Sequence, residues 1–286
     1  MRVLVNGVRL FVDIDGEGLT PDGGTMRAKP TVILVHGGPG ADHSVYKPSY
    51  TPLVDIAQLV YYDHRGNRRS DPGKRSDWTL AQWGDDLKGL CDALAIERPI
   101  VLGTSFGGFV ALSYATRHPG HAAGLVLIST AAHVDFECVY AAFERLGGPE
   151  ARAIAEAYWE EPTVERRLAY RENCVPLYER IGSGSTEWLE RIAWNHESAL
   201  WFNGPHREHG RMDFRPDLGT IASPVLILAG EDDPITPPEF SDALASGLVN
   251  ADVTYVKYPD CGHGVMRDRP GNAMAELRRF ISSMGD

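Results

Sequence analysis

The sequence predicts an α/β fold, in which helices flank a mostly parallel central sheet, and three observations lead to it. Short, uninterrupted apolar runs recur along the chain, which is typical of strands buried on both faces of a parallel sheet. Segments with helical patterns separate these runs, as the connections between parallel strands require. One long interval contains no such run, which indicates an insertion between two strands.

The apolar runs and the segments between them define the elements in order. The predicted strands cover residues 31–35, 59–62, 100–102, 124–128, 225–228 and 253–256. The predicted helices cover residues 79–96, 106–118, 237–249 and 271–283. Residues 1–10 are predicted to form a hairpin that turns at Asn6-Gly7, a dipeptide that favours two-residue turns. Residues 16–30, rich in Gly, Pro and Asp, are predicted to be a surface loop.

The interval without strands is predicted to be a helical cap of residues 135–217, inserted into a core made of residues 1–134 and 218–286. In open α/β sheets such an insertion covers the carboxyl ends of the strands, where ligands bind. The cap holds four of the six tryptophans, and it carries 16 Asp and Glu against 10 Arg. Its acidity has two interpretations: a solvated helix surface, or a pocket that accepts a cation.

Composition excludes several classes of function. The 286-residue chain has a formal net charge of −11, which argues against a nucleic-acid partner or an anionic membrane. It contains no apolar run of the roughly 20 residues that a membrane span needs, and no signal peptide is recognised, so we expect a cytoplasmic protein. The four cysteines are scattered without a Cys-x-x-Cys pair, so neither a metal site nor a disulfide framework is expected.

The strongest functional signal is the Gly-x-Ser-x-Gly pattern of residues 103–107. A predicted strand precedes it and a predicted helix follows it. A serine on such a sharp turn exposes its hydroxyl group, and the first N–H groups of the helix can face a developing oxyanion. We therefore predict that Ser105 is a nucleophile rather than an ordinary loop serine.

A serine nucleophile needs a base and an acidic residue that orients the base, and in this topology they follow in the order Ser, acid, His. His263 lies in a glycine-flanked loop after the last predicted strand and is the predicted base. The acid is one of three adjacent residues, Glu231, Asp232 and Asp233. Asp233 is favoured because it precedes a proline, which favours an extended turn; Asp232 remains the main alternative.

The glycine-rich segment of residues 36–40 follows the first buried strand. A turn at that place can direct a backbone N–H toward the serine, so Gly38 and Phe106 are the predicted oxyanion-hole residues. A phosphate-binding loop is disfavoured because the segment lacks the Lys-Ser/Thr of a P-loop and the spacing of a dinucleotide motif.

At these residues the chain resembles the α/β-hydrolase superfamily and, within it, the proline iminopeptidase family, over nearly its whole length. Residues 36–40 match that family's HGGPG, residues 63–70 resemble its DQRG-x-GRS with departures at His64 and Arg68, and residues 103–108 stand at its GGSWGG. The resemblance implies an α/β-hydrolase fold with Ser105, Asp233 and His263 as its catalytic triad.

The family holds its substrate's free α-amine with glutamates of the cap. Residues 197–204 resemble the corresponding stretch, which places Glu197 at the amine-binding position and Trp201 beside it as a substrate contact. Glu160, after Tyr158-Trp159, stands at the family's second glutamate. Surface helix carboxylates are the alternative interpretation of both glutamates.

We therefore expect a serine hydrolase that needs no cofactor and acts on a short peptide or another small molecule; a homo-oligomer is compatible with the sequence. The favoured activity is an aminopeptidase that releases N-terminal proline or a small apolar residue. The alternative is an esterase, lactonase or amidase for apolar acyl substrates. A small-molecule receptor with an idle triad is a third hypothesis. Dehalogenases and epoxide hydrolases are disfavoured because they need a carboxylate nucleophile where this chain has Ser105.

Overall fold

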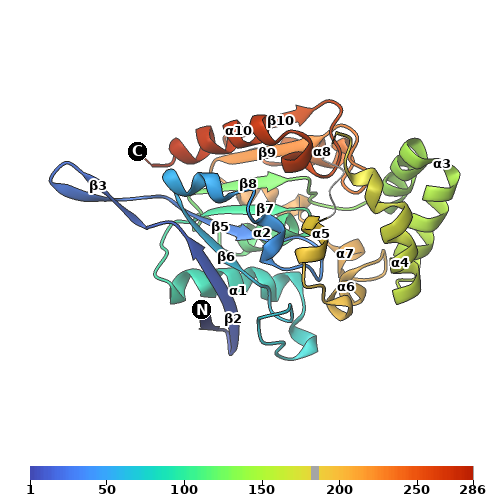
Figure 1. Ribbon diagram of the computed structural model, residues 1–286, viewed down its shortest axis with the longest axis horizontal. Helices are drawn as coiled ribbons and strands as arrows, with labels where there is room; N and C mark the ends of the chain where they lie inside the picture. The colour runs from blue at the N-terminus through green and yellow to red at the C-terminus, as the bar shows by residue number, and fades with distance from the viewer. Residues whose placement is uncertain (182–186, 286) are drawn as a thin grey trace.

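The computed structural model describes residues 1–181 and 187–285, and its centre is an eight-stranded sheet of order β1-β2-β6-β5-β7-β8-β9-β10 (Figure 1). From β6 to β10 all neighbouring strands run parallel, whereas β1 and β2 are antiparallel. The bounds are β1 Arg2–Val5, β2 Val8–Asp15, β5 Thr31–Val35, β6 Gln58–Tyr62, β7 Ile100–Thr104, β8 Gly124–Ile128, β9 Val225–Gly230 and β10 Val253–Tyr258. The predicted α/β fold is confirmed, and each predicted strand corresponds to one of these.

Two predictions about the first thirty residues have different outcomes. Asn6 and Gly7 both have positive φ and join β1 to β2, so the predicted hairpin is confirmed. The prediction of a loop at residues 16–30 is wrong. Strands β3 (Leu19–Asp22) and β4 (Thr25–Ala28) pair there as a second hairpin, which extends away from the rest of the molecule (Figure 1).

Helices cover both faces of the sheet, and alternate residues of each strand therefore pack into two separate cores. Ile33 and Val35 pack into a core with side chains of α1, α2 and α8, whereas Val32 and Leu34 pack into a second core with side chains of α10. The bounds are α1 Leu80–Ala93, α2 Phe106–Arg117, α8 Pro238–Gly247, α9 Val265–Asp268 and α10 Pro270–Ser282. The four predicted core helices are confirmed within a few residues at their ends.

Between β8 and β9 the described residues form helices and connecting segments, without a strand of the central sheet. The helices are α3 Phe136–Glu160, α4 Val164–Asn173, α5 Glu187–Arg191, α6 His196–Phe202 and α7 Glu208–Arg211. A break at Gly148, where φ is 78°, interrupts α3. In Figure 1 these helices lie beyond the ends of the strands. No helix of the described residues is both long enough and apolar enough to cross a membrane.

Candidate active site

Ser105 occupies the turn between β7 and α2, as the sequence predicted. Its φ of 56° and ψ of −124° lie outside the regions that non-glycine residues usually adopt, a conformation that costs roughly 1–3 kcal/mol. Hydrogen bonds hold the residue in place: its N–H donates to Ile128 O at 2.9 Å, and its carbonyl accepts from Thr130 Oγ1 at 2.8 Å. Such stored strain at a partly exposed hydroxyl group is typical of a functional position.

The glycines of the motif are required by close backbone packing. A Cβ atom at Gly107 would lie 1.9 Å from Val35 O, and one at Gly103 would lie 2.4 Å from Gly107 O. At Gly108 it would lie 2.3 Å from Thr130 Oγ1. Only glycine therefore allows the helix to start this close to the sheet, which brings its first N–H groups to the side of Ser105.

The structure brings the side chains of Asp233 and His263 together. His263 Nδ1 and Asp233 Oδ2 are 2.8 Å apart, and the Asp233 side chain is completely buried. Asp233 also accepts hydrogen bonds from the backbone N–H groups of Ile235 and Thr236 and from Thr236 Oγ1. With its lone pairs so occupied, the carboxylate has one orientation, and it leaves His263 Nε2 as the free ring nitrogen.

Asp232, the main alternative for the acid, has a different partner. Asp232 lies 3.3 Å from the Arg180 guanidinium in a partly exposed ion pair. Cys261, beside His263, is fully buried, and burial raises the pKa of its thiol to about 12. A thiol with so high a pKa is a poor nucleophile, which leaves Ser105 as the nucleophile candidate in this group.

The loop that carries His263 is fastened to the segment that follows α4. The Asp268 carboxylate accepts backbone hydrogen bonds from Arg180, Ile181 and Gly262, at 2.8–3.0 Å. Gly264 N–H donates to Tyr178 O at 3.1 Å. The position of the histidine is therefore coupled to residues that lie far away in the sequence.

The glycine-rich segment of residues 36–40 lies against the Ser105 turn. A Cβ atom at Gly37 would be 2.8 Å from Thr104 O and 3.3 Å from Ser105 Cβ, and Gly38 lines the same cavity as Ser105. His36 Nε2 accepts from the backbone N–H of His64, and burial lowers the pKa of both imidazoles. This neutral pair connects the segment of residues 36–40 to the loop after β6. His64, which departs from the family's motif, therefore has a structural contact at this position.

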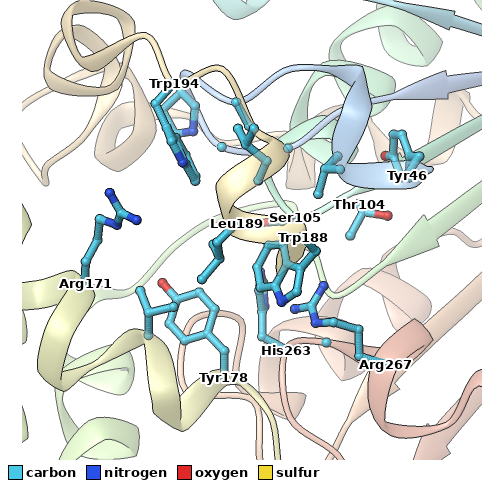
Figure 2. A pocket seen from close by; sticks show the side chains of 18 of the residues that line it. Tyr46, Thr104, Ser105, Arg171, Tyr178, Trp188, Leu189, Trp194, His263 and Arg267 are labelled. Atoms are coloured by element: carbon cyan, nitrogen blue, oxygen red, sulfur yellow. The ribbon is translucent and has the colours of Figure 1, made fainter. Parts of the chain in front are cut away.

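A cavity of about 200 Å³ opens between Ser105 and the helices above it. This is smaller than the ~300–1,000 Å³ common for ligand pockets, so it suits a small group. Figure 2 shows Trp188 and Leu189 of α5 in front of Ser105, with Tyr178 and Arg171 on one side and Arg267 on the other. The aromatic residues that line the cavity are Tyr46, Tyr50, Tyr158, Trp159, Tyr170, Tyr178, Trp188 and Trp194.

The structure does not bring the predicted substrate-binding residues of the cap to this cavity. Glu197 is 56% exposed and pairs with the Arg75 guanidinium at 3.2 Å. Glu160 accepts a hydrogen bond from Tyr140 OH at 3.0 Å and is 45% exposed. Trp201 donates through Nε1 to Trp78 O at 2.9 Å. None of the three is among the described residues that line the cavity, so this geometry does not assemble the expected amine-binding arrangement, which stays a prediction.

The sequence did not predict the charged residues that do line the cavity. They are Arg167, Arg171, Arg191 and Arg267, and no Asp or Glu is among the described lining residues. The described carboxylates of residues 135–217 thus lie away from this cavity, and the idea of a pocket that accepts a cation is not supported. The i, i+4 spacing of Arg167 and Arg171 was the available signal, because it places both on one face of a helix.

Comparisons with known proteins agree with this geometry. Residues 30–161 match the model of the alpha/beta hydrolase fold family, and residues 192–283 match that of the TAP-like protein family. The chain is 30% identical over 275 residues to a putative carbamate hydrolase RutD of Caulobacter sp. (strain K31), covering 94% of this chain and 97% of that one. It is 27% identical over 282 residues to the proline iminopeptidase PfmaB of Pestalotiopsis fici, covering 95% and 98%.

Among solved structures, the proline iminopeptidase of Mycobacterium smegmatis superposes with a TM-score of 0.77 at 20% identity, covering 100% of this chain and 98% of that one. The chain belongs to the α/β-hydrolase fold family. The predicted resemblance to proline iminopeptidases, in sequence and in fold, is confirmed.

Proposed function

We propose that this protein is a serine hydrolase that works through an acyl-enzyme on Ser105. The observation that carries the proposal is the Asp233–His263 hydrogen bond of 2.8 Å, made beneath a cavity that both Ser105 and His263 line. Asp233 fixes the imidazole so that Nδ1 carries a proton and Nε2 is free to act as the base.

The reaction follows from this arrangement. His263 Nε2 takes the proton of Ser105 Oγ as that oxygen attacks the carbonyl carbon. The N–H groups of Gly38 and Phe106 stabilise the oxyanion, and the tetrahedral intermediate collapses as His263 returns the proton to the leaving group. Water, activated by the same imidazole, then attacks the acyl-enzyme and releases the acid and free Ser105.

The charges of the cavity select among the substrates of such an enzyme. Four arginines line it, and the described lining residues include no carboxylate. An α-ammonium group brought there would lose its hydration without gaining an opposite charge. We therefore propose that the substrate is an ester, lactone or amide without a free α-amine, held among aromatic side chains.

An aminopeptidase is the second candidate, and the 27% identity to the proline iminopeptidase PfmaB over 95% of the chain favours it. In that case an amine-binding carboxylate has to come from a rearranged cap, since Glu197 and Glu160 lie outside the cavity.

A matched pair of substrates separates the two candidates. Proline p-nitroanilide and cyclopentanecarboxylic acid p-nitroanilide have the same ring size and leaving group and differ in the ring ammonium. We expect kcat/KM to be at least about tenfold higher for the cyclopentane compound, because the ammonium meets like charges in the cavity. Faster release from the proline compound, reduced in Glu197→Gln or Glu160→Gln, would favour the aminopeptidase instead.

A further inference from the structure

The four arginines of the cavity differ in how their charge is balanced. Arg267 lies 3.9 Å from the ring of Trp188, and its guanidinium pairs with Glu179. Arg191 is exposed and donates to the backbone carbonyl Lys47 O at 3.0 Å. The remaining two, Arg167 and Arg171, have no Asp or Glu within ion-pair distance among the described residues.

Arg167 is an unusual residue because its charge is buried and lacks an anionic partner. Its side chain lines the cavity, and only 6% of the residue is exposed. Its guanidinium lies 2.6 Å from His196 Nδ1 and 4.8 Å from the centre of the Trp194 ring, contacts that supply no negative charge. Burial, and secondarily the charge of Arg171, lower the pKa of Arg167 below its usual value. Folded proteins rarely keep such a charge without a partner.

Arg171 lies one helical turn further along α4 and adds a second positive charge. Its guanidinium lies 5.8 Å from the centre of the same Trp194 ring. Burial, followed by the charges of Arg167 and Arg171, lowers the pKa of His196, which keeps this imidazole neutral. The cluster of Arg167, Arg171 and His196 is therefore positive overall.

The nearby aromatic side chains add hydrogen-bond donors rather than negative charge. The indole N–H groups of Trp159 and Trp194, both cavity residues, have no acceptor among the described residues. The Tyr170 and Tyr178 hydroxyl groups bond to each other at 2.8 Å, and burial raises the pKa of both well above its usual value, so they stay neutral. This wall of the cavity lacks an anion and offers donors to one.

We propose that Arg167 and Arg171 form a carboxylate-binding subsite, and that the substrate is an acyl compound with a carboxylate at the end remote from the cleaved bond. A guanidinium pair can bind a carboxylate through charge-assisted, two-pronged hydrogen bonds. Burial of Arg167 then serves binding, because a desolvated cation interacts more strongly with an anion than a hydrated one. The assignment of the anion as substrate rests on the proposed hydrolase function, whereas the binding site itself does not.

Binding of matched ligands to the Ser105→Ala protein tests the subsite without turnover. Monomethyl succinate, glutarate and adipate carry the carboxylate at increasing distance, and methyl valerate is the neutral counterpart of the glutarate. Calorimetry is expected to show the best monoester binding about 10-fold to 100-fold more tightly than methyl valerate. Arg171→Gln and Arg167→Met should each remove most of this difference.

Arg166→Gln is the matched control, since Arg166 belongs to the same helix but pairs with Glu161 and does not line the cavity. The proposal would be overturned if the neutral and anionic ligands bound equally well, or if inorganic phosphate bound more tightly than the monoesters. It would also be overturned if the difference in affinity between the monoester and methyl valerate were unchanged in Arg171→Gln. Because Arg171 is half-buried, its variant keeps the test decisive even if Arg167→Met fails to fold. Failure of the hydrolase function would appear separately, as wild-type protein that binds the monoesters without cleaving them.

Discussion

At the scale of single residues, the carboxylate of Asp233 has the most specific surroundings in the candidate site. Two backbone N–H groups, the Thr236 hydroxyl group and the His263 imidazole all donate to it, and its side chain is completely buried. An aspartate held this way sets the tautomer of the histidine and stabilises the imidazolium that forms during catalysis. Its neighbour Asp232 has the same chemistry but a surface partner, Arg180.

This difference predicts opposite outcomes for two matched variants. Asp233→Asn should lower kcat by roughly 10⁴-fold, because an amide can hold the wrong tautomer of His263. Asp232→Asn should stay within a few-fold of the wild type, because an exposed ion pair contributes little. Steady-state hydrolysis of a p-nitrophenyl ester measures both. A large loss of activity in Asp232→Asn together with an active Asp233→Asn would show that Asp232, and not Asp233, is the acid.

The sequence predicted much of this residue-level chemistry, and its limit has a physical cause. Ser105 and His263 follow strands on glycine-flanked turns, and that local signal was sufficient to propose them. The choice between Asp232 and Asp233 depends on which way each side chain leaves one turn, which the residue before a proline could only favour. In the structure Asp233 is the one that is buried and hydrogen-bonded to His263, which favours it as the proposed acid.

At the scale of elements, strands buried on both faces were predictable, whereas short exposed elements were not. The β3–β4 hairpin was missed because its strands are exposed and polar and turn at Gly23-Gly24, as a loop would. The direction of Glu197 was missed for another reason. The Asn195 N–H donates to Gly40 O at 2.7 Å, and this tertiary contact helps to set how α6 is oriented on the core.

The contact between residues 180–181, which follow α4, and the His263 loop gives an element-scale prediction. Asp268 accepts backbone N–H groups from both, so Asp268→Asn places an amide against donors and should destabilise the fold by about 1–3 kcal/mol. It should also lower kcat more than it raises KM, since His263 loses its support. Thermal unfolding and the pH profile of kcat measure the two effects.

Asp260→Asn is the control for that variant. Asp260 lies in the same loop and its side chain is 84% exposed. Its ion pair with Arg269 is long, at 3.8 Å. Its replacement should leave stability and activity close to those of the wild type. If Asp268→Asn behaved like Asp260→Asn, Asp268 would have no positioning role.

At the scale of the whole molecule, charge is segregated between surface and cavity. The chain carries a formal net charge of −11, yet four arginines line the cavity that contains Ser105. Net charge reports on the surface, because charged side chains are mostly exposed, so composition could not reveal a cationic interior. The relevant signal was the spacing of arginines within one helix.

Buried histidines predict how stability depends on pH. Burial lowers the pKa of His209 to about 3 and lowers those of His36 and His64 as well. Below the unfolded pKa of about 6.5 the unfolded chain takes up protons that the folded protein excludes, so stability falls as the pH drops from there toward 3. Each such histidine contributes a loss of up to about 1.4 kcal/mol per pH unit.

His209→Phe isolates one of these contributions. The ring of His209 packs among Phe106, Phe109, Phe136 and Trp159, so a phenyl ring suits the site. The melting temperature of His209→Phe should fall less than that of the wild type between pH 6.5 and pH 4. His206→Gln, which changes an exposed histidine, should follow the wild type. Parallel curves for all three proteins would show that His209 does not carry an acid-sensitive contribution.

We propose that Ser105 forms a covalent acyl-enzyme with His263 as its base. Intact-protein mass spectrometry after reaction with a fluorophosphonate, followed by peptide mapping, tests it most directly. We expect one adduct, on Ser105, with labelling lost in Ser105→Ala and slowed at least about 10³-fold in His263→Ala. Ester hydrolysis by protein that carries no adduct on Ser105, or an adduct formed equally fast without His263, would contradict it.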